Sequence, residues 1–91
     1  MLTPERTKRF RKNFKLCMKR GYDVSAFEEV YDLLIEEKPL PERCRNHKLH
    51  GKFADYWECH VKSDWLLIYR YDYKRQVITF EDTGTHSDLF K

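Results

Sequence analysis

The residue types that can move protons gather in the second half of the chain. All four histidines lie there, at His47, His50, His60 and His86. His60 alternates with Glu58 and Lys62, and alternate residues of a strand point to one face, so these side chains are predicted to lie in a row. Asp64 follows where a turn is expected. Such a row could carry acid–base chemistry, or it could be an ordinary solvated strand face.

Cleavage of RNA is one reaction that these side chains could perform. A base removes the proton from a 2′-OH, which attacks the adjacent phosphate, while an acid protonates the leaving 5′-oxygen. Histidine suits both steps because its ordinary pKa is about 6.5, and a cation can stabilise the charge on phosphorus. Aromatic rings can stack on single-stranded bases, and the candidates are Tyr56, Trp65 and Phe90. This set of side chains is sufficient for the reaction but not unique to it.

The composition indicates one globular domain, residues 1–91, with an uneven charge distribution. Hydrophobic residues make up 41% of the chain and charged residues 36%. Residues 1–20 carry a net charge of +7, whereas residues 21–38 carry −5. A basic first element could bind a polyanion through phosphate contacts. It could equally be a solvated helix face whose charge is offset by the acidic segment that follows.

Neither a membrane span nor a secretion signal is indicated by the sequence. No apolar run approaches the ~20 residues needed to cross a bilayer, and the first residues lack the apolar stretch of a signal peptide. The three cysteines are an odd number, which argues against a disulfide framework. We therefore expect a cytoplasmic protein.

The first half of the chain predicts two helices. Thr3 followed by Pro4 is typical of a helix start, and Gly21 of a helix end. The apolar residues that recur at helical spacing between them are Phe10, Phe14 and Cys17. Asp23 can cap a second helix, which the prolines at 39 and 41 would stop. Its apolar stripe is formed by Phe27, Val30, Tyr31 and Leu34. So short a joint predicts a helical hairpin.

After the prolines the apolar pattern changes to that of strands. Strands are predicted at 56–62, 65–71 and 76–81, with a weaker one at 45–49. The joints between the three stronger strands are short enough for hairpins. The sequence therefore predicts an α+β fold, in which an N-terminal helical hairpin packs on a mostly antiparallel sheet of about four strands.

Three separated segments of the second half carry specific motifs. Residues 46–51 read Asn-His-Lys-Leu-His-Gly, residues 56–69 contain Glu-Cys-His and Asp-Trp-Leu-Leu-Ile-Tyr, and residues 83–90 read Thr-Gly-Thr-His-Ser-Asp-Leu-Phe. In order and spacing they resemble the D-H-x-L-x-G, R-E-C-H-x-x-P-D-W-L-L-I-Y and T-G-(S/T)-H-x-x-L-F motifs of YafQ-type toxins, a branch of the RelE family. The helical half agrees in pattern but carries no diagnostic motif.

The resemblance implies a RelE-like fold and an activity. The expected activity is that of a toxin of a type II toxin–antitoxin system, an endoribonuclease that needs no metal or other cofactor and cleaves mRNA in the ribosomal A site. The ribosome would help to position the substrate. The expected protein partner is a DinJ-type antitoxin that wraps the toxin and neutralises it.

The resemblance also implies roles for individual residues. His86 matches the general acid, and His60 with Asp64 matches the base side of the site, with His47 nearby. Glu58 matches a carboxylate close to the site. The residues expected to contact RNA are Trp65, Phe90, Lys62, Arg70 and Lys48.

Several of these residues have plain structural alternatives. His47 could be a hydrogen-bonding residue at a strand end. Trp65 could belong to the core, and Phe90 could be a hydrophobic plug at the C-terminal end. His86 is harder to explain structurally, because no core is expected to demand a histidine so near the chain end.

Two positions depart from the family pattern. Asp82 stands where an arginine usually stabilises charge on the phosphate, and Trp57 stands where another arginine is usual. A carboxylate at position 82 would repel the substrate. Loss of one charge-stabilising donor can slow a reaction by roughly 10² to 10³. Our hypothesis is a ribonuclease of weakened or altered activity.

Two other classes of function remain open from the sequence. The chain could be a non-catalytic, toxin-like module that binds an antitoxin or RNA, as Asp82 would favour. It could also hold zinc, for which a loose set of ligands is Cys44, His47, His50, Cys59 and His60. Strand alternation sends Cys59 and His60 to opposite faces, so a single zinc site is the weaker of the two alternatives.

Overall fold

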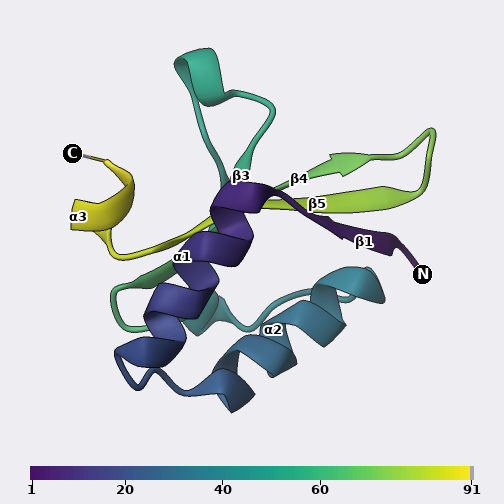
Figure 1. Cartoon of the computed structure of the whole chain (residues 1–91). Coiled ribbons are helices and arrows are strands. Elements are labelled where there is room, and N and C mark those ends of the chain that lie inside the picture. The colour runs from purple at the N-terminus through teal and green to yellow at the C-terminus, as the bar shows by residue number, and fades with distance from the viewer. Residues whose placement is uncertain (91) are drawn as a thin grey trace.

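The computed structural model describes residues 1–90 of the chain (Figure 1). Within these residues the strands are β1 Thr3–Arg6, β2 His47–Lys48, β3 Trp57–Lys62, β4 Trp65–Asp72 and β5 Val77–Gly84. The α-helices are α1 Lys8–Lys19, α2 Val24–Ile35 and α3 His86–Leu89. Two 3-10 turns, η1 Glu42–Cys44 and η2 Gly51–Phe53, lie on either side of β2. None of the helices in this part of the chain is long and apolar enough to cross a membrane.

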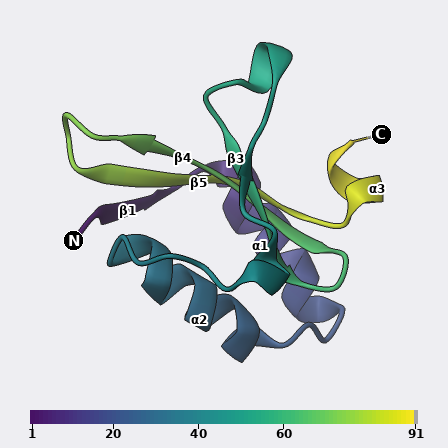
Figure 2. The ribbon, with the colours of Figure 1, turned by 180° about the vertical axis from the view of Figure 1, so that it is seen from behind.

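The strands form one sheet in the order β1-β5-β4-β3-β2. β1 runs parallel to β5, and the other neighbouring pairs are antiparallel. α1 and α2 form the expected hairpin, and the loop that carries η2 projects away from α2 (Figure 1 and Figure 2). The predicted α+β class is confirmed, with five strands in place of about four.

The prediction of a helix start at Thr3 and Pro4 is wrong. These residues begin β1, whose four residues pair in parallel with β5 from Val77 to Phe80. Pro4 is tolerated because β1 is an edge strand, where a missing N–H costs no ladder hydrogen bond. The helix begins only after Thr7, whose Oγ1 accepts from the Phe10 N–H and donates to the backbone carbonyl of Glu81.

The boundaries of the helical hairpin follow local chemistry. Gly21 adopts φ +81° in the joint after α1, a conformation that glycine allows without strain. Asp23 caps α2 as predicted, since its carboxylate accepts from the Ser25 N–H at 3.0 Å. α2 ends at Ile35, ahead of the prolines, because Glu37 already turns the backbone to φ +58°.

An aromatic cluster holds both helices on one face of the sheet. The Phe27 ring centroid lies 6.0 Å from that of Phe10 and 6.0 Å from that of Trp65. Phe10 in turn lies 5.8 Å from Phe80 of β5. Such pairs add roughly 0.5–1.5 kcal/mol each beyond the area they bury. These rings occupy the helix-facing side, and the opposite face of β3 and β4 carries Glu58 and His60 together with Leu66 and Ile68.

The short helix α3 is fastened at its first turn. Thr85 and Asp88 form a capping box, and Arg20, the C-cap residue of α1, donates to both oxygens of Asp88, at 2.6 and 3.1 Å. These bonds, that of Arg20 first, hold the pKa of Asp88 well below its usual range. Gly84 is required beside this carboxylate, because an added Cβ would lie 2.8 Å from Asp88 Oδ2. The placement of α3 therefore depends on Asp88, which Arg20 holds by hydrogen bonds and beside which only glycine fits at position 84.

We predict that Asp88→Asn lowers the melting temperature at pH 7 by about 4–8 °C, which corresponds to loss of a helix cap worth ~1 kcal/mol. The folded pKa of Asp88 lies below its unfolded value, so its contribution is present above the ordinary carboxyl pKa and is lost as pH falls through the lowered one. The difference between variant and wild type should therefore shrink below about pH 4. Thermal unfolding at several pH values measures this, with the exposed loop variant Asp55→Asn as the control. Equal melting temperatures at pH 7 would contradict it.

Candidate active site

Asp64 and His86 meet at one end of the sheet. His86 Nδ1 lies 2.5 Å from Asp64 Oδ1, and the His86 backbone N–H donates to the same oxygen at 3.2 Å. The hydrogen bonds from His86 lower the pKa of Asp64. An ionised carboxylate can only accept, so Nδ1 of His86 carries the proton. The turn between β3 and β4 thus fixes both the position and the tautomer of a histidine that begins α3.

His60 lies next to His86, with ring centroids 5.9 Å apart. Its Nδ1 is 2.9 Å from the carbonyl oxygen of Ser63. A carbonyl only accepts, so Nδ1 carries the proton and a neutral His60 keeps a lone pair on Nε2. Among residues 1–90 no partner bonds Nε2 of either ring. Asp64, which was expected at the base side with His60, is thus bonded to His86, and each imidazole keeps one nitrogen for a substrate.

Phe90 extends this group of rings. Its centroid lies 6.1 Å from that of His86, and 47% of the residue is exposed. An exposed ring of this kind can stack on an unpaired base. The plug alternative is not favoured, because Phe90 is not buried. We call the three neighbouring rings of His60, His86 and Phe90 the ring row.

Glu58 and His47 form a separate contact behind the ring row. His47 of β2 pairs with Glu58 of β3, and its Nε2 lies 3.5 Å from Glu58 Oε1. The other ring nitrogen of His47 lies 2.7 Å from the carbonyl oxygen of Arg45. Glu58 is only 5% exposed, so its expected place on a solvated strand face is wrong. The His47 side chain, opposite Glu58 in the sheet register, lies against this carboxylate, and Glu58 acts as a support for His47.

The expected row of Glu58, His60 and Lys62 is broken at Lys62. The pairing of β3 with β4 shifts register between His60 and Lys62, next to Ser63 at φ +51°. A bulge of this kind changes the face to which the following side chain points. Lys62 Nζ lies 3.6 Å from Asp23 Oδ2, in the joint between the helices. Lys62 is therefore directed away from His60 and does not supply the missing cation.

Trp65 belongs to the core, and its expected contact with RNA is wrong. It is 3% exposed and lies against Phe14, Tyr22 and Phe27. Its Nε1 donates to Thr83 Oγ1 at 2.8 Å, and that hydroxyl donates to the Leu66 carbonyl at 2.7 Å. The physical reason is the helical hairpin, which covers the face of β4 that carries Trp65.

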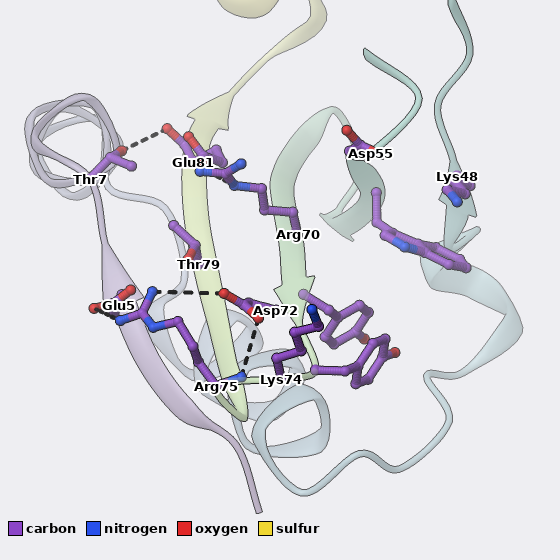
Figure 3. A pocket seen from close by; sticks show the side chains of 13 residues that line it. Glu5, Thr7, Lys48, Asp55, Arg70, Asp72, Lys74, Arg75, Thr79 and Glu81 are labelled. Carbon is purple, nitrogen blue, oxygen red and sulfur yellow. Dashed lines mark hydrogen bonds and ion pairs between the residues drawn. The ribbon is translucent and has the colours of Figure 1, made fainter.

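Arg70 and Lys48 line a hollow of about 630 Å³ that contains none of the histidines (Figure 3). Arg70 Nε lies 2.8 Å from Glu81 Oε1, and Arg75 in the same hollow pairs with Glu5. Figure 3 shows these carboxylates facing the arginines. The positive charge of these arginines is thus largely balanced by carboxylates of the same hollow. Contact of Arg70 and Lys48 with RNA stays a prediction.

Asp82 is tied to α1. Its Oδ1 accepts from Asn13 Nδ2 at 2.6 Å and from the Thr83 N–H at 2.8 Å. It lies on β5 opposite Ile68, at a second register shift. A half-buried carboxylate with two donors is held in one orientation. The side chain at position 82 is therefore a hydrogen-bond acceptor in a fixed orientation.

The loose zinc set does not come together. Within residues 1–90 no group of three His, Cys, Asp or Glu side chains is placed to hold a metal ion. Cys59 is fully buried and belongs to the core, whereas the neighbouring His60 joins the ring row. Cys17, Cys44 and Cys59 are all free, as expected.

Residues that the sequence did not single out complete the surroundings of the ring row. A hollow of about 280 Å³ beside Phe90 is lined by Arg9, Leu49, Phe53 and Ile68, among others. These residues come from a helix, a loop and a strand, so no spacing in the sequence connects them. Tyr56, a stacking candidate, also lines it.

Comparison with known proteins shows the family of this chain. Residues 2–91 match the family model described as bacterial toxin of type II toxin-antitoxin system, YafQ. The mRNA interferase toxin YafQ of Escherichia coli strain K12 is 39% identical over 82 residues, covering 89% of this chain and 87% of that protein. The chain is thus a bacterial toxin of the type II toxin–antitoxin class.

Solved structures of related toxins have the same fold as this chain. The toxin in the crystal structure of the E. coli DinJ-YafQ complex matches with a TM-score of 0.90 and 35% identity, over 100% of both chains. A metal-bound toxin from Helicobacter pylori matches with a TM-score of 0.93 and 37% identity, over 99% of this chain and 100% of that one. This chain belongs to the YafQ family of toxins.

We predict that Trp65→Phe lowers the free energy of unfolding by about 1–3 kcal/mol, because Thr83 loses its buried donor and a small void remains. Urea unfolding measures this. Binding of single-stranded RNA by the folded variant should be unchanged, since the indole does not reach the surface. A variant of unaltered stability with weaker RNA binding would contradict the core role.

Proposed function

We propose that this chain is an endoribonuclease toxin that cleaves messenger RNA. The observation that carries the proposal is the convergence of two imidazoles, His60 and His86, at 5.9 Å on the face of the sheet opposite the helices. In both rings Nδ1 is held by an acceptor, and both keep Nε2 for a substrate. Relatives that share 39% of the sequence are named mRNA interferases, which supports the same activity here.

The geometry supports a division of roles between the two rings. The lone pair on His60 Nε2 takes the proton of the 2′-OH, and the oxygen then attacks the adjacent phosphorus. The bond from phosphorus to the 5′-oxygen breaks, and that oxygen takes a proton from His86. In this step His86 acts as the doubly protonated imidazolium, whose Nδ1–H stays bonded to Asp64 and whose Nε2–H goes to the leaving oxygen. The products are a 2′,3′-cyclic phosphate and a 5′-hydroxyl end. Asp64 acts as a positioning residue for His86, and the pair of Glu58 and His47 borders the base side.

The proposed setting is the ribosomal A site, in the cytoplasm. α1 carries six basic residues and no acidic one, which suits a surface that faces ribosomal RNA. These basic residues are Lys8, Arg9, Arg11, Lys12, Lys15 and Lys19. A ribosome that holds both toxin and messenger would supply the orientation that the small open site lacks.

The proposed protein partner is an antitoxin of the DinJ type. The E. coli relative is found in a DinJ-YafQ complex, and this chain matches that toxin over its whole length. The net charge of +3 and the basic α1 favour an acidic partner segment. No cofactor is needed for the proposed acid–base reaction.

We predict that His86→Ala lowers cleavage of translated messenger RNA by about 10²- to 10⁴-fold, the usual contribution of a general acid. Mapping of cut ends after induction without antitoxin measures this, together with relief of growth arrest. His50→Ala is the matched control, because His50 is an exposed imidazole outside the ring row. Growth arrest that persists in His86→Ala, or its absence in the wild type, would contradict the proposal, and the latter would favour a binding module.

We further propose that Asp82 slows phosphate chemistry compared with relatives that carry arginine there. Two cations that could replace it are engaged elsewhere, since Lys62 is directed to Asp23 and Arg70 is paired with Glu81. We predict that Asp82→Arg raises the cleavage rate by about tenfold or more. Asp32→Arg, with the same charge change on α2, controls for general attraction to RNA. An unchanged or lower rate in Asp82→Arg would contradict this.

A further inference from the structure

A small hollow with apolar walls and an acidic edge adjoins the ring row. Its volume is about 280 Å³, just below the ~300–1,000 Å³ that is usual for small-molecule sites and enough for one small planar group. The apolar side chains that line it are Leu49, Phe53, Tyr56, Ile68, Leu89 and Phe90. The carboxylates of Glu81 and Asp82 lie along it, and Arg9 stands at the same hollow.

The hollow lies directly beside the ring row, because Phe90 belongs to both. Ile68 lies between Glu58 of β3 and Asp82 of β5 in the sheet register. Phe90 belongs both to the hollow and to the ring row, 6.1 Å from His86. A base beside a phosphate at His60 and His86 is therefore within reach of these walls, and aromatic rings are the usual platform for unpaired bases.

The acidic edge is an acceptor whose direction is fixed. Asn13 and the Thr83 N–H both donate to Oδ1 of Asp82, which leaves Oδ2 with no partner among residues 1–90. Arg70 Nε donates a hydrogen bond to Oε1 of Glu81. These donors offset part of the negative charge, and they hold the acceptor in place without closing the hollow. An acceptor of this kind selects for a ligand that donates.

We propose that this hollow binds one nucleobase of the RNA substrate and that Asp82 selects a base with an exocyclic amino group. The proposal rests on the proposed ribonuclease function. Adenine, cytosine and guanine each present an amino group, whereas uracil presents a carbonyl in its place. An apolar side chain of an antitoxin would also fit the walls, but it would leave the Asp82 acceptor unused.

The test exchanges one atom of the acceptor. In Asp82→Asn the amide oxygen is held by the same two donors, from Asn13 and Thr83, so the amide NH₂ takes the place of Oδ2. Wild type should cut about tenfold better where the adjoining base carries an amino group than where it is uracil. Asp82→Asn should remove or reverse that preference. Asp32→Asn, an exposed carboxylate on α2, is the matched control and should keep it.

A binding measurement tests the hollow as a base site independently of RNA cleavage. The probes are 2′-O-methylated AAA and UUU trinucleotides, which cannot be cleaved, and the signal is the methyl resonance of Ile68. AAA should shift it more than UUU in wild type, and Asp82→Asn should reverse the order. Equal shifts for both probes, or none up to millimolar concentration, would overturn the hollow as a base site.

The two failures are distinguishable. A wild type that cuts translated messenger RNA with no preference at the adjoining base, in parallel with Asp82→Asn, overturns the inference and leaves the function intact. A wild type that cuts nothing while Ile68 still discriminates AAA from UUU overturns the function and supports the hollow. An antitoxin side chain as the occupant would give the first of these outcomes.

Discussion

The hydrogen bond between the Asp64 carboxylate and the His86 imidazole joins segments that are 22 residues apart in the chain. It requires a tight turn after β3 at one end and a precisely started helix α3 at the other. Gly84 leaves room for the Asp88 carboxylate, and Arg20 then fastens that carboxylate from α1. Most contacts at this end of the sheet therefore serve to hold one imidazole beside another on a surface that is otherwise open to water.

The division of the sheet into two faces makes this surface possible. The aromatic cluster of α1, α2, β4 and β5 occupies one face and includes Trp65. The other face carries the ring row, the supported His47 and the hollow beside Phe90. Basic residues on α1 and the acceptor at Asp82 lie at its margin. Stability and chemistry thus draw on opposite sides of the same strands, so a substitution can alter one with little effect on the other.

The sequence predicted the helical hairpin, the three long strands and the residues of the ring row, because periodicity and short motifs are local signals. It did not predict β1, since Thr3 and Pro4 suit a helix start as well as an edge strand. The bulge at Lys62 and the cover over Glu58 depend on pairing with distant strands, and no spacing reveals them. The bond between Asp64 and His86 and the small hollow likewise arise from tertiary contacts, which the sequence pattern does not reveal.

In the proposed reaction His60 and His86 act on opposite sides of one scissile phosphate. A substrate in which sulfur replaces the bridging 5′-oxygen tests it most directly, because a thiolate leaves without protonation. Cleavage of this substrate by His86→Ala should approach the wild-type rate, while His60→Ala should stay slow because the 2′-OH still needs a base. Equal rescue of both variants, or rescue of neither, would contradict the account.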